Sequence, residues 1–226
     1  SFGSPLVLPL FSILDPTVVE SLPDRQRGNG IVDTFVHVME QYLTYPVNAM
    51  IQDRYAEGIL LTLIEIGPKV LADATNYDVN ANFMWASTMA LNGLISCGVP
   101  EDWTSHMIGH EITALHGVDH ARTLAVVLPG VMNVMRESKR EKLLQYAQRV
   151  WNITQGDEQQ IIDQAIQKTV DFFESMGLKT HLRDYKIPVT TIEEIVERME
   201  VRGSVNIGEN KEVGIIEIRK ILKDRF

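Results

Sequence analysis

One short stretch, residues 105–120, limits how this chain can fold, because it holds four of the six histidines of the 226-residue sequence. His106 and His110 are four residues apart, so a helix places both side chains on one face. In an unbroken helix His106 and His120 would lie about 21 Å apart, 14 residues at about 1.5 Å each. Gly117 predicts a helix end between them. The chain therefore has to turn at Gly117 if His120 is to approach the first two histidines.

A second polar pair lies inside an otherwise apolar helix, expected over residues 30–43. Asp33 and His37 are again four residues apart, and Glu40 follows one turn later on the same side. A buried carboxylate and a buried imidazole need polar partners. Two interpretations stay open: the pair hydrogen-bonds with each other and with neighbouring groups, or it forms part of a site with the histidine-rich stretch.

The rest of the sequence predicts an all-α fold. Helices are expected over residues 30–43, 47–66, 79–96, 100–116, 121–127, 142–151, 158–176, 191–202 and 213–223. Gly67 and Pro68 are expected to close the second helix, and Pro129 to kink or end the fifth. Residues 1–16 are cut by three prolines, which favours an edge strand or extended chain. We therefore expect a bundle-like helical domain over residues 17–226, preceded by a short strand remnant.

Composition excludes several classes of protein. A net charge of −9 argues against a nucleic-acid partner, since such proteins usually carry a basic face. No apolar run approaches the roughly 18 residues that a membrane span needs. With a single cysteine and no signal-peptide pattern at residue 1, a cytoplasmic protein is expected. The sequence also lacks an initiator methionine, so a fragment or a processed product is expected.

The two polar groups together supply a set of metal ligands. The set consists of Asp33, His37, His106 and His120. One carboxylate and three imidazoles suit Fe(II) or Zn(II) far better than Mg(II) or Cu(I). Zinc-protease helices carry a glutamate directly after the first histidine, and Met107 stands there instead. A metal-dependent hydrolase would have to use Glu40 or Glu111 as its base, which makes it the weakest interpretation.

One ordered set of motifs runs the whole length of the chain. It comprises Asp33-x-x-x-His37, His106-x-x-x-His110, His116-Gly117 and His120, with Leu14-Asp15-Pro16, Leu22-Pro23, Gln52-Asp53-Arg54-Tyr55-Ala56-Glu57-Gly58, Ala90-Leu91-Asn92-Gly93 and Gly208-Glu209-Asn210 as context. This set resembles the iron-containing alcohol dehydrogenases, and within them the branch of NADPH-dependent aldehyde reductases and butanol dehydrogenases.

The resemblance implies a role for each histidine of the stretch. It assigns the divalent metal, Fe2+ or Zn2+, to the four residues named above, and it places His110 near the nicotinamide, where it helps to position groups or to move a proton. For His116 a position marking the helix end before Gly117 is an equally good interpretation. His181 receives no role.

The resemblance also implies a fold and a reaction. The domain corresponds to the C-terminal half of a dehydroquinate synthase-like two-domain fold, with residues 1–16 as the last strand of the N-terminal nucleotide-binding domain. The implied reaction is hydride transfer between NADP(H) and a primary alcohol or aldehyde substrate, in an enzyme that often forms homodimers. The Gly-rich phosphate-binding turn of that family is missing here, so a non-catalytic metal-binding helical domain is the alternative.

Overall fold

The computed structural model describes residues 4–226, and within this range the fold is all-α, as predicted. The α-helices are α1 (Asp24–Tyr42), α2 (Met50–Ala72), α3 (Tyr77–Leu91), α4 (Thr104–His116), α5 (His120–Val134), α6 (Arg140–Arg149), α7 (Glu158–Ser175), α8 (Thr191–Val201) and α9 (Ile215–Asp224). Short 3-10 helices lie at Pro5–Val7, Pro16–Ser21 and Leu182–Tyr185. No helix among the described residues combines the length and the apolar character that a membrane crossing requires.

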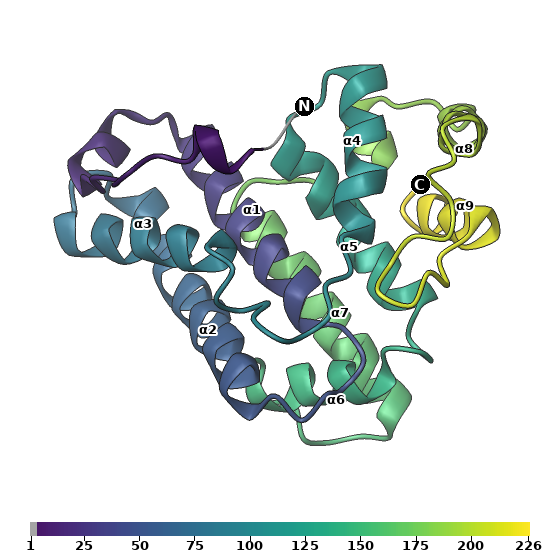
Figure 1. The fold of residues 1–226 in the computed structure, drawn as a ribbon, viewed down its shortest axis with the longest axis horizontal. Helices are drawn as coiled ribbons and strands as arrows, with labels where there is room; N and C mark the ends of the chain where they lie inside the picture. Colours follow the sequence, from purple (N-terminus) through teal and green to yellow (C-terminus); the bar gives the residue numbers. More distant parts are fainter. Residues whose placement is uncertain (1–3) are drawn as a thin grey trace.

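Helix α5 organises the domain, because it packs between two groups of helices (Figure 1). Leu124 and Leu128 on one face join the core formed with α1, α2, α3, α6 and α7. Val127 and Val131 on another face join the core formed with α4, α8 and α9. A helix buried on both sides has to be apolar nearly all round, and its N-terminus is thereby fixed between α1 and α4.

Two prolines expected to end or kink helices lie inside helices that continue past them. Helix α2 runs through Gly67 and Pro68 to Ala72, and α5 runs through Pro129 to Val134. The prediction of a helix end at Gly67 was wrong because this glycine serves close packing: a Cβ there would lie 2.9 Å from Met176 Sδ. Packing against α7 outweighs the single backbone hydrogen bond that a proline removes.

The turn between α4 and α5 forms as the sequence predicts. Gly117 ends α4 in the left-handed conformation, with φ 65°, and α5 begins three residues later at His120. Helix α4 itself begins at Thr104, later than the expected residue 100, after Trp103 with φ 63°.

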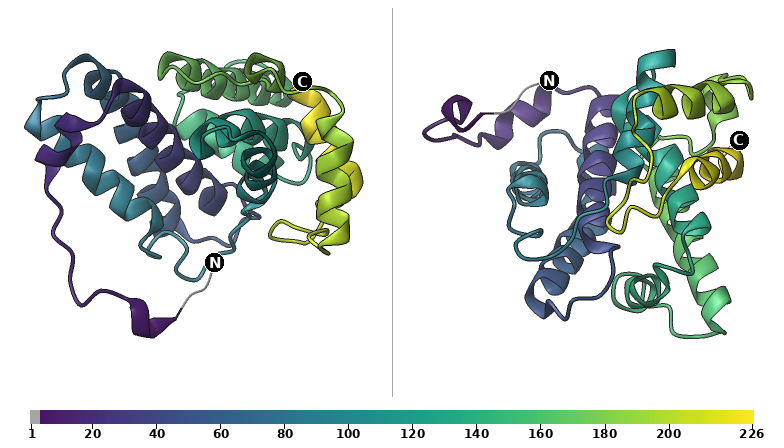
Figure 2. Two further views of the ribbon diagram at one scale, coloured as in Figure 1. Left: turned by 90° about the horizontal axis from the view of Figure 1, so that it is seen from above. Right: turned by 45° about the vertical axis from the view of Figure 1, so that its right-hand side comes forward.

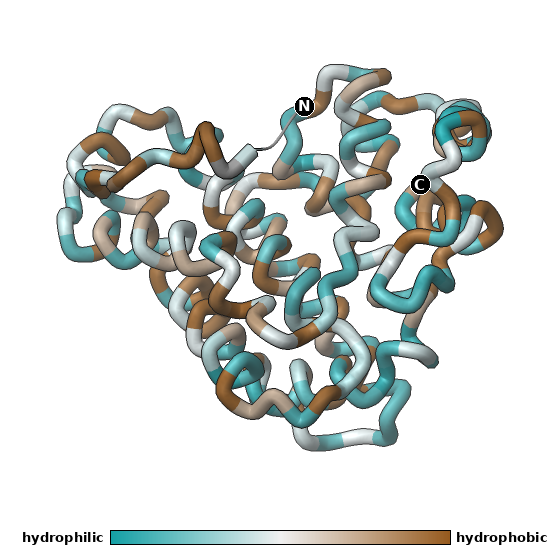
Figure 3. The backbone as a smooth tube through the Cα atoms, in the orientation of Figure 1, coloured by the Kyte–Doolittle hydropathy of each residue, from teal (hydrophilic) through white to brown (hydrophobic). Residues whose placement is uncertain are grey.

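The expected strand remnant is not formed in the described part of residues 1–16. Pro5–Val7 is a 3-10 turn, and the chain after it is extended without a paired strand. Figure 2 shows this segment standing away from the helices, and Figure 3 shows that much of it is hydrophobic. Leu10 and Phe11 are exposed. A strand requires a partner strand for its backbone, and none lies within reach among residues 4–226.

Candidate metal centre

Three helices bring the four predicted ligands together. Asp33 and His37 lie one turn apart on α1, His106 lies in the first turn of α4, and His120 is the first residue of α5. The Nε2 atoms of His37 and His106 are 3.3 Å apart, and His37 Nε2 is 3.7 Å from Asp33 Oδ2. Ligand atoms of Asp33, His37 and His106 all lie within 4.8 Å of one another. The helices therefore place one carboxylate and two imidazoles around one point.

His120 completes the group from the side of α5. Its Nε2 atom is 3.6 Å from Asp33 Oδ1, and its ring centroid is 5.0 Å from that of His106. This approach depends on the break at Gly117, because the two histidines would otherwise lie on a single long helix.

The chemistry of this group fits a divalent cation. Asp33 Oδ1 is buried without a hydrogen-bond partner within the described residues, so one carboxylate oxygen lacks the compensation that burial demands. Desolvation lowers the pKa of His106 and of His120 to about 4, against the opposing attraction of Asp33, and it also lowers the pKa of His37. The imidazoles are therefore neutral near pH 7, which is the form that binds metals.

Glu40 contacts His106 on the side that faces away from the other predicted ligands. This carboxylate is buried on α1, its Oε2 contacts His106 Nδ1, and its Oε1 accepts a hydrogen bond from the Ser105 N–H. Burial, and then the charge of Asp102, raises the pKa of Glu40 to about 8 despite the backbone donors. Glu111 is also buried and pairs with Arg198 and Arg202 of α8. Since neither glutamate faces an open site, neither is placed to act as the base of a hydrolase.

The other histidines lie outside the converging group. His110 is exposed one turn after His106, and its ring stacks on that of His120 with centroids 4.9 Å apart. His116 Nε2 lies 3.0 Å from Thr191 Oγ1, at the end of α4, which agrees with its interpretation as a helix-end residue. His181 lies in the loop before the 3-10 helix Leu182–Tyr185.

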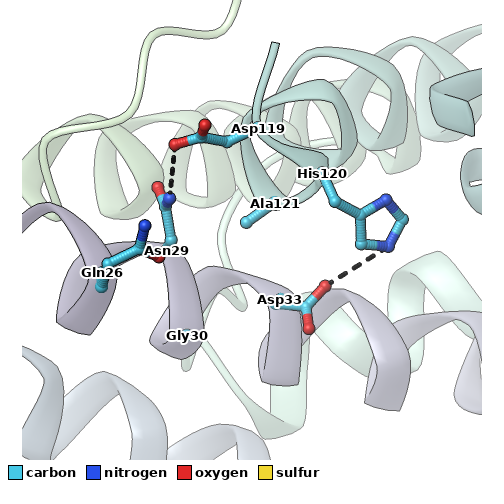
Figure 4. A pocket seen from close by; sticks show the side chains of 7 residues that line it. All are labelled: Gln26, Asn29, Gly30, Asp33, Asp119, His120 and Ala121. Atoms are coloured by element: carbon cyan, nitrogen blue, oxygen red, sulfur yellow. Dashed lines mark hydrogen bonds and ion pairs between the residues drawn. The ribbon is translucent and has the colours of Figure 1, made fainter. Parts of the chain in front are cut away.

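A pocket of about 370 Å³ opens next to Asp33 and His120, between α1 and the start of α5 (Figure 4). Asp119 lines this pocket and links α5 to α1, since its carboxylate accepts hydrogen bonds from Asn29 Nδ2 at 2.8 Å and from Arg25 Nε at 2.8 Å. The sequence analysis did not identify this role of Asp119. Asp119 directly precedes the predicted ligand His120, but its hydrogen-bond partners Asn29 and Arg25 lie 90 and 94 residues away in the sequence, and no local spacing indicates them.

An all-α domain with this aspartate and histidine constellation belongs to a known class of metal-dependent dehydrogenases. Residues 29–225 match the C-terminal part of the Fe-containing alcohol dehydrogenase family, and the chain belongs to this family. The resemblance inferred from the motifs is thereby confirmed.

Individual relatives agree with this placement. The chain is 55% identical over 221 residues to the NADPH-dependent aldehyde reductase YqhD of Escherichia coli, covering 98% of the chain and 57% of that protein. It is 34% identical to a probable NADH-dependent butanol dehydrogenase of Bacillus subtilis, again covering 98% of the chain and 57% of the relative. The solved structure of the substrate- and cofactor-free E. coli aldehyde reductase superposes with a TM-score of 0.98 at 54% identity, covering all of this chain and 59% of that one. The chain thus spans a little over half the length of these relatives.

Proposed function

We propose that this chain is the metal-binding helical domain of an NADP(H)-dependent aldehyde reductase and alcohol dehydrogenase. The observation that carries the proposal is the convergence of Asp33, His37, His106 and His120 from three helices beside an open pocket. The names of the relatives support the substrate class, primary alcohols and aldehydes. The cofactor NADP(H) is supported by the name of the E. coli aldehyde reductase, which is NADPH-dependent.

The chemistry divides between bound groups and the residues of this chain. When bound, a divalent ion supplies a Lewis acid for the carbonyl oxygen, and NADPH supplies the hydride. Asp33 contributes one negative charge and three neutral histidines contribute none, so the site leaves a divalent ion with net positive charge. Such a residual charge would stabilise the alkoxide-like oxygen that develops in the transition state.

His110 is placed for a different task. Its ring is exposed and stacks on His120, outside the group of buried ligands. An exposed imidazole beside the site is suited to pass a proton between solvent and the developing alcohol oxygen. We therefore propose His110 as the acid–base residue near the nicotinamide and His120 as a ligand.

Two finer statements belong to the proposal. Both Fe2+ and Zn2+ suit one carboxylate and three imidazoles, and we name the metal as either of them. A cytoplasmic location and a homodimer stay predictions of the sequence.

The first experiment measures metal content. The chain is purified without chelator, and Fe and Zn are determined by mass spectrometry in the native chain and in the His106→Ala and His120→Ala variants. We expect close to one ion per native chain and loss of the ion in both variants. His181→Ala is the matched control, because it removes a histidine from a loop outside the group and is expected to keep the ion. Full metal content in His106→Ala would refute the ligand assignment.

The second experiment tests the reaction. Because the chain covers 57% of the E. coli aldehyde reductase at 55% identity, the preceding part of that protein can be fused to it as a cofactor domain. We expect the hybrid to oxidise NADPH when an aldehyde is added, and His110→Ala to keep the metal but slow the turnover. A folded, metal-loaded hybrid without activity would favour the alternative, a non-catalytic metal-binding domain.

A further inference from the structure

The N-terminus of α4 has no capping side chain of its own. Trp103 occupies the cap position in the left-handed conformation, and its side chain makes no capping hydrogen bond. The first amide groups of a helix carry a partial positive charge and need acceptors. Other parts of the chain provide them: Asp102 Oδ1 accepts from the Thr104 N–H at 3.2 Å, and Glu40 accepts from the next two amides. The cap of α4 is thus largely supplied by α1.

Glu40 binds the backbone and the ring of the same residue. Its Oε1 accepts from the Ser105 N–H and, at 3.4 Å, from the His106 N–H, while its Oε2 contacts His106 Nδ1. The backbone N–H of Asp102 also donates to the Glu40 carbonyl oxygen at 2.9 Å, which ties the approach to α4 to the same turn of α1. His106 is therefore held at its main chain and at the ring nitrogen that faces away from the converging group.

We propose that Glu40 is a positioning residue of the metal centre, which fixes the orientation and the tautomer of His106. The inference rests on the proposed function, since it takes His106 as a ligand. When a cation binds Nε2, the single proton between Glu40 and His106 lies on Nδ1 and Glu40 is the carboxylate; Nε2 is the atom that lies 3.3 Å from His37 Nε2. Carboxylates that bind the distal nitrogen of a ligand histidine commonly orient the ring and raise its basicity.

The position requires a carboxylate and not merely a polar side chain of the same shape. Both oxygens of Glu40 face nitrogen atoms, the Ser105 N–H and the ring Nδ1 of His106, and Nδ1 is an N–H donor once Nε2 binds a cation. A glutamine would present an acceptor to one donor and its NH2 group to the other. Either the helix cap or the contact with His106 is then lost, and a buried donor is left without a partner.

The experiment compares Glu40→Gln with Glu111→Gln. Glu111 is a suitable control because it is also buried and lies on α4, but its carboxylate pairs with α8. The dissociation constant for Zn2+ is measured by competition with a chromophoric chelator in the native chain, both variants and His106→Ala. We expect Glu40→Gln to weaken Zn2+ binding by about 10- to 100-fold. Glu111→Gln is expected to bind within twofold of the native chain, although it also loses ion pairs of a buried carboxylate.

A second measurement needs no variant and keeps the inference testable if Glu40→Gln does not fold. Long-range 1H–15N correlation spectra of the imidazoles in the Zn2+-loaded native chain report which nitrogen of His106 carries the proton. We expect a proton on Nδ1 and metal on Nε2.

Each outcome separates the two proposals. Metal bound to His106 Nδ1, or a folded Glu40→Gln variant with native affinity, would overturn the role of Glu40 while leaving the metal site intact. A native chain that binds no Zn2+, or binds it equally well in His106→Ala, would overturn the proposed site itself and with it the role of Glu40.

Discussion

Replacing Lys139 by methionine tests how strongly a buried ion cluster stabilises the domain next to the proposed metal centre. The Lys139 side chain is 1% exposed, and its Nζ lies 2.7 Å from Glu209 Oε1 and 3.0 Å from Asp102 Oδ2. It also donates to the Leu43 carbonyl oxygen at 2.7 Å, at the end of α1. The Lys139 ammonium group therefore links the end of α1, the residues just before α4 and the loop before α9. Methionine fills similar space but leaves two buried carboxylates without a counterion.

The size of the effect follows from this geometry. Removing one partner of a buried ion pair typically costs about 3–5 kcal/mol, because the remaining charge stays desolvated. A domain of this size loses about 2–4 °C of melting temperature per kcal/mol. We therefore expect Lys139→Met to lower the free energy of unfolding by about 3–5 kcal/mol and the melting temperature by about 6–20 °C.

Urea denaturation followed by circular dichroism, at pH 7 and at pH 5, measures this loss. The difference from the native chain should narrow at pH 5. Burial already raises the pKa of Glu209 although Lys139 opposes the shift, and without the lysine the carboxyl takes up a proton more readily, which removes the buried charge. Lys69→Met is the control: Lys69 pairs with Glu65 on the surface of α2, and its loss should leave the unfolding midpoint unchanged. A Lys139→Met variant as stable as the native chain would refute the reasoning.

Three further predictions concern the metal centre. In Gly109→Ala the new Cβ would lie 2.9 Å from Thr123 Oγ1 and 3.2 Å from Leu124 Cδ2, so α4 must move away from α5. We expect the free energy of unfolding, measured by urea denaturation, to fall by about 1–3 kcal/mol, and Zn2+ binding to weaken. In the control Gly58→Ala the new Cβ meets nothing within 4 Å, and this variant should be more stable than the native chain. The metal-free chain should lose stability as the pH falls from about 6.5 towards 4. His106 and His120, with pKa values of about 4, stay neutral in the folded chain over this range, whereas in the unfolded chain they take up protons. Melting temperatures measured across this range give the dependence of stability on pH, and His106→Gln should make that dependence weaker. Zn2+ at 100 times its dissociation constant should stabilise the native chain by about 2.7 kcal/mol, and chelation should reverse the gain; unchanged melting in either direction would contradict specific binding to the folded state.

The helices were predictable from the apolar repeat, but some of their ends were not. Gly67 and Pro68 carry the local signs of a helix end, yet α2 continues to Ala72. The reason is a contact with α7, where Met176 and Phe172 pack closely against the missing side chain of Gly67. A contact over more than 100 residues leaves no mark in the local sequence. The assignment of residues 1–16 as a strand remnant stays a prediction, because strand formation depends on a partner strand and residues 4–226 supply none.

The convergence of the proposed ligands was predictable to the level of their spacing in the sequence. The pairs at i and i+4, and the glycine that turns the chain before His120, indicated which side chains can converge. They left open whether Asp33 and His37 merely bond with each other, and the 3.3 Å approach of His106 to His37 is a tertiary fact. Glu40 lies on the predicted face of its helix, but its role depends on the N-terminus of α4, which begins 64 residues later, at Thr104.

Because Glu40 of α1 caps the N-terminus of α4, the formation of α4 and the convergence of the histidines are coupled. A peptide of residues 104–116 is too short to be a stable helix in water, and it lacks the Glu40 carboxylate that accepts from the Ser105 and His106 N–H groups. In the native chain the amide protons of Ser105 and His106 point at a buried carboxylate, so their exchange with deuterium requires α1 and α4 to separate. The hydrogen-exchange rates of these two amides therefore report how often α1 and α4 separate, and with them how often the histidine cluster comes apart.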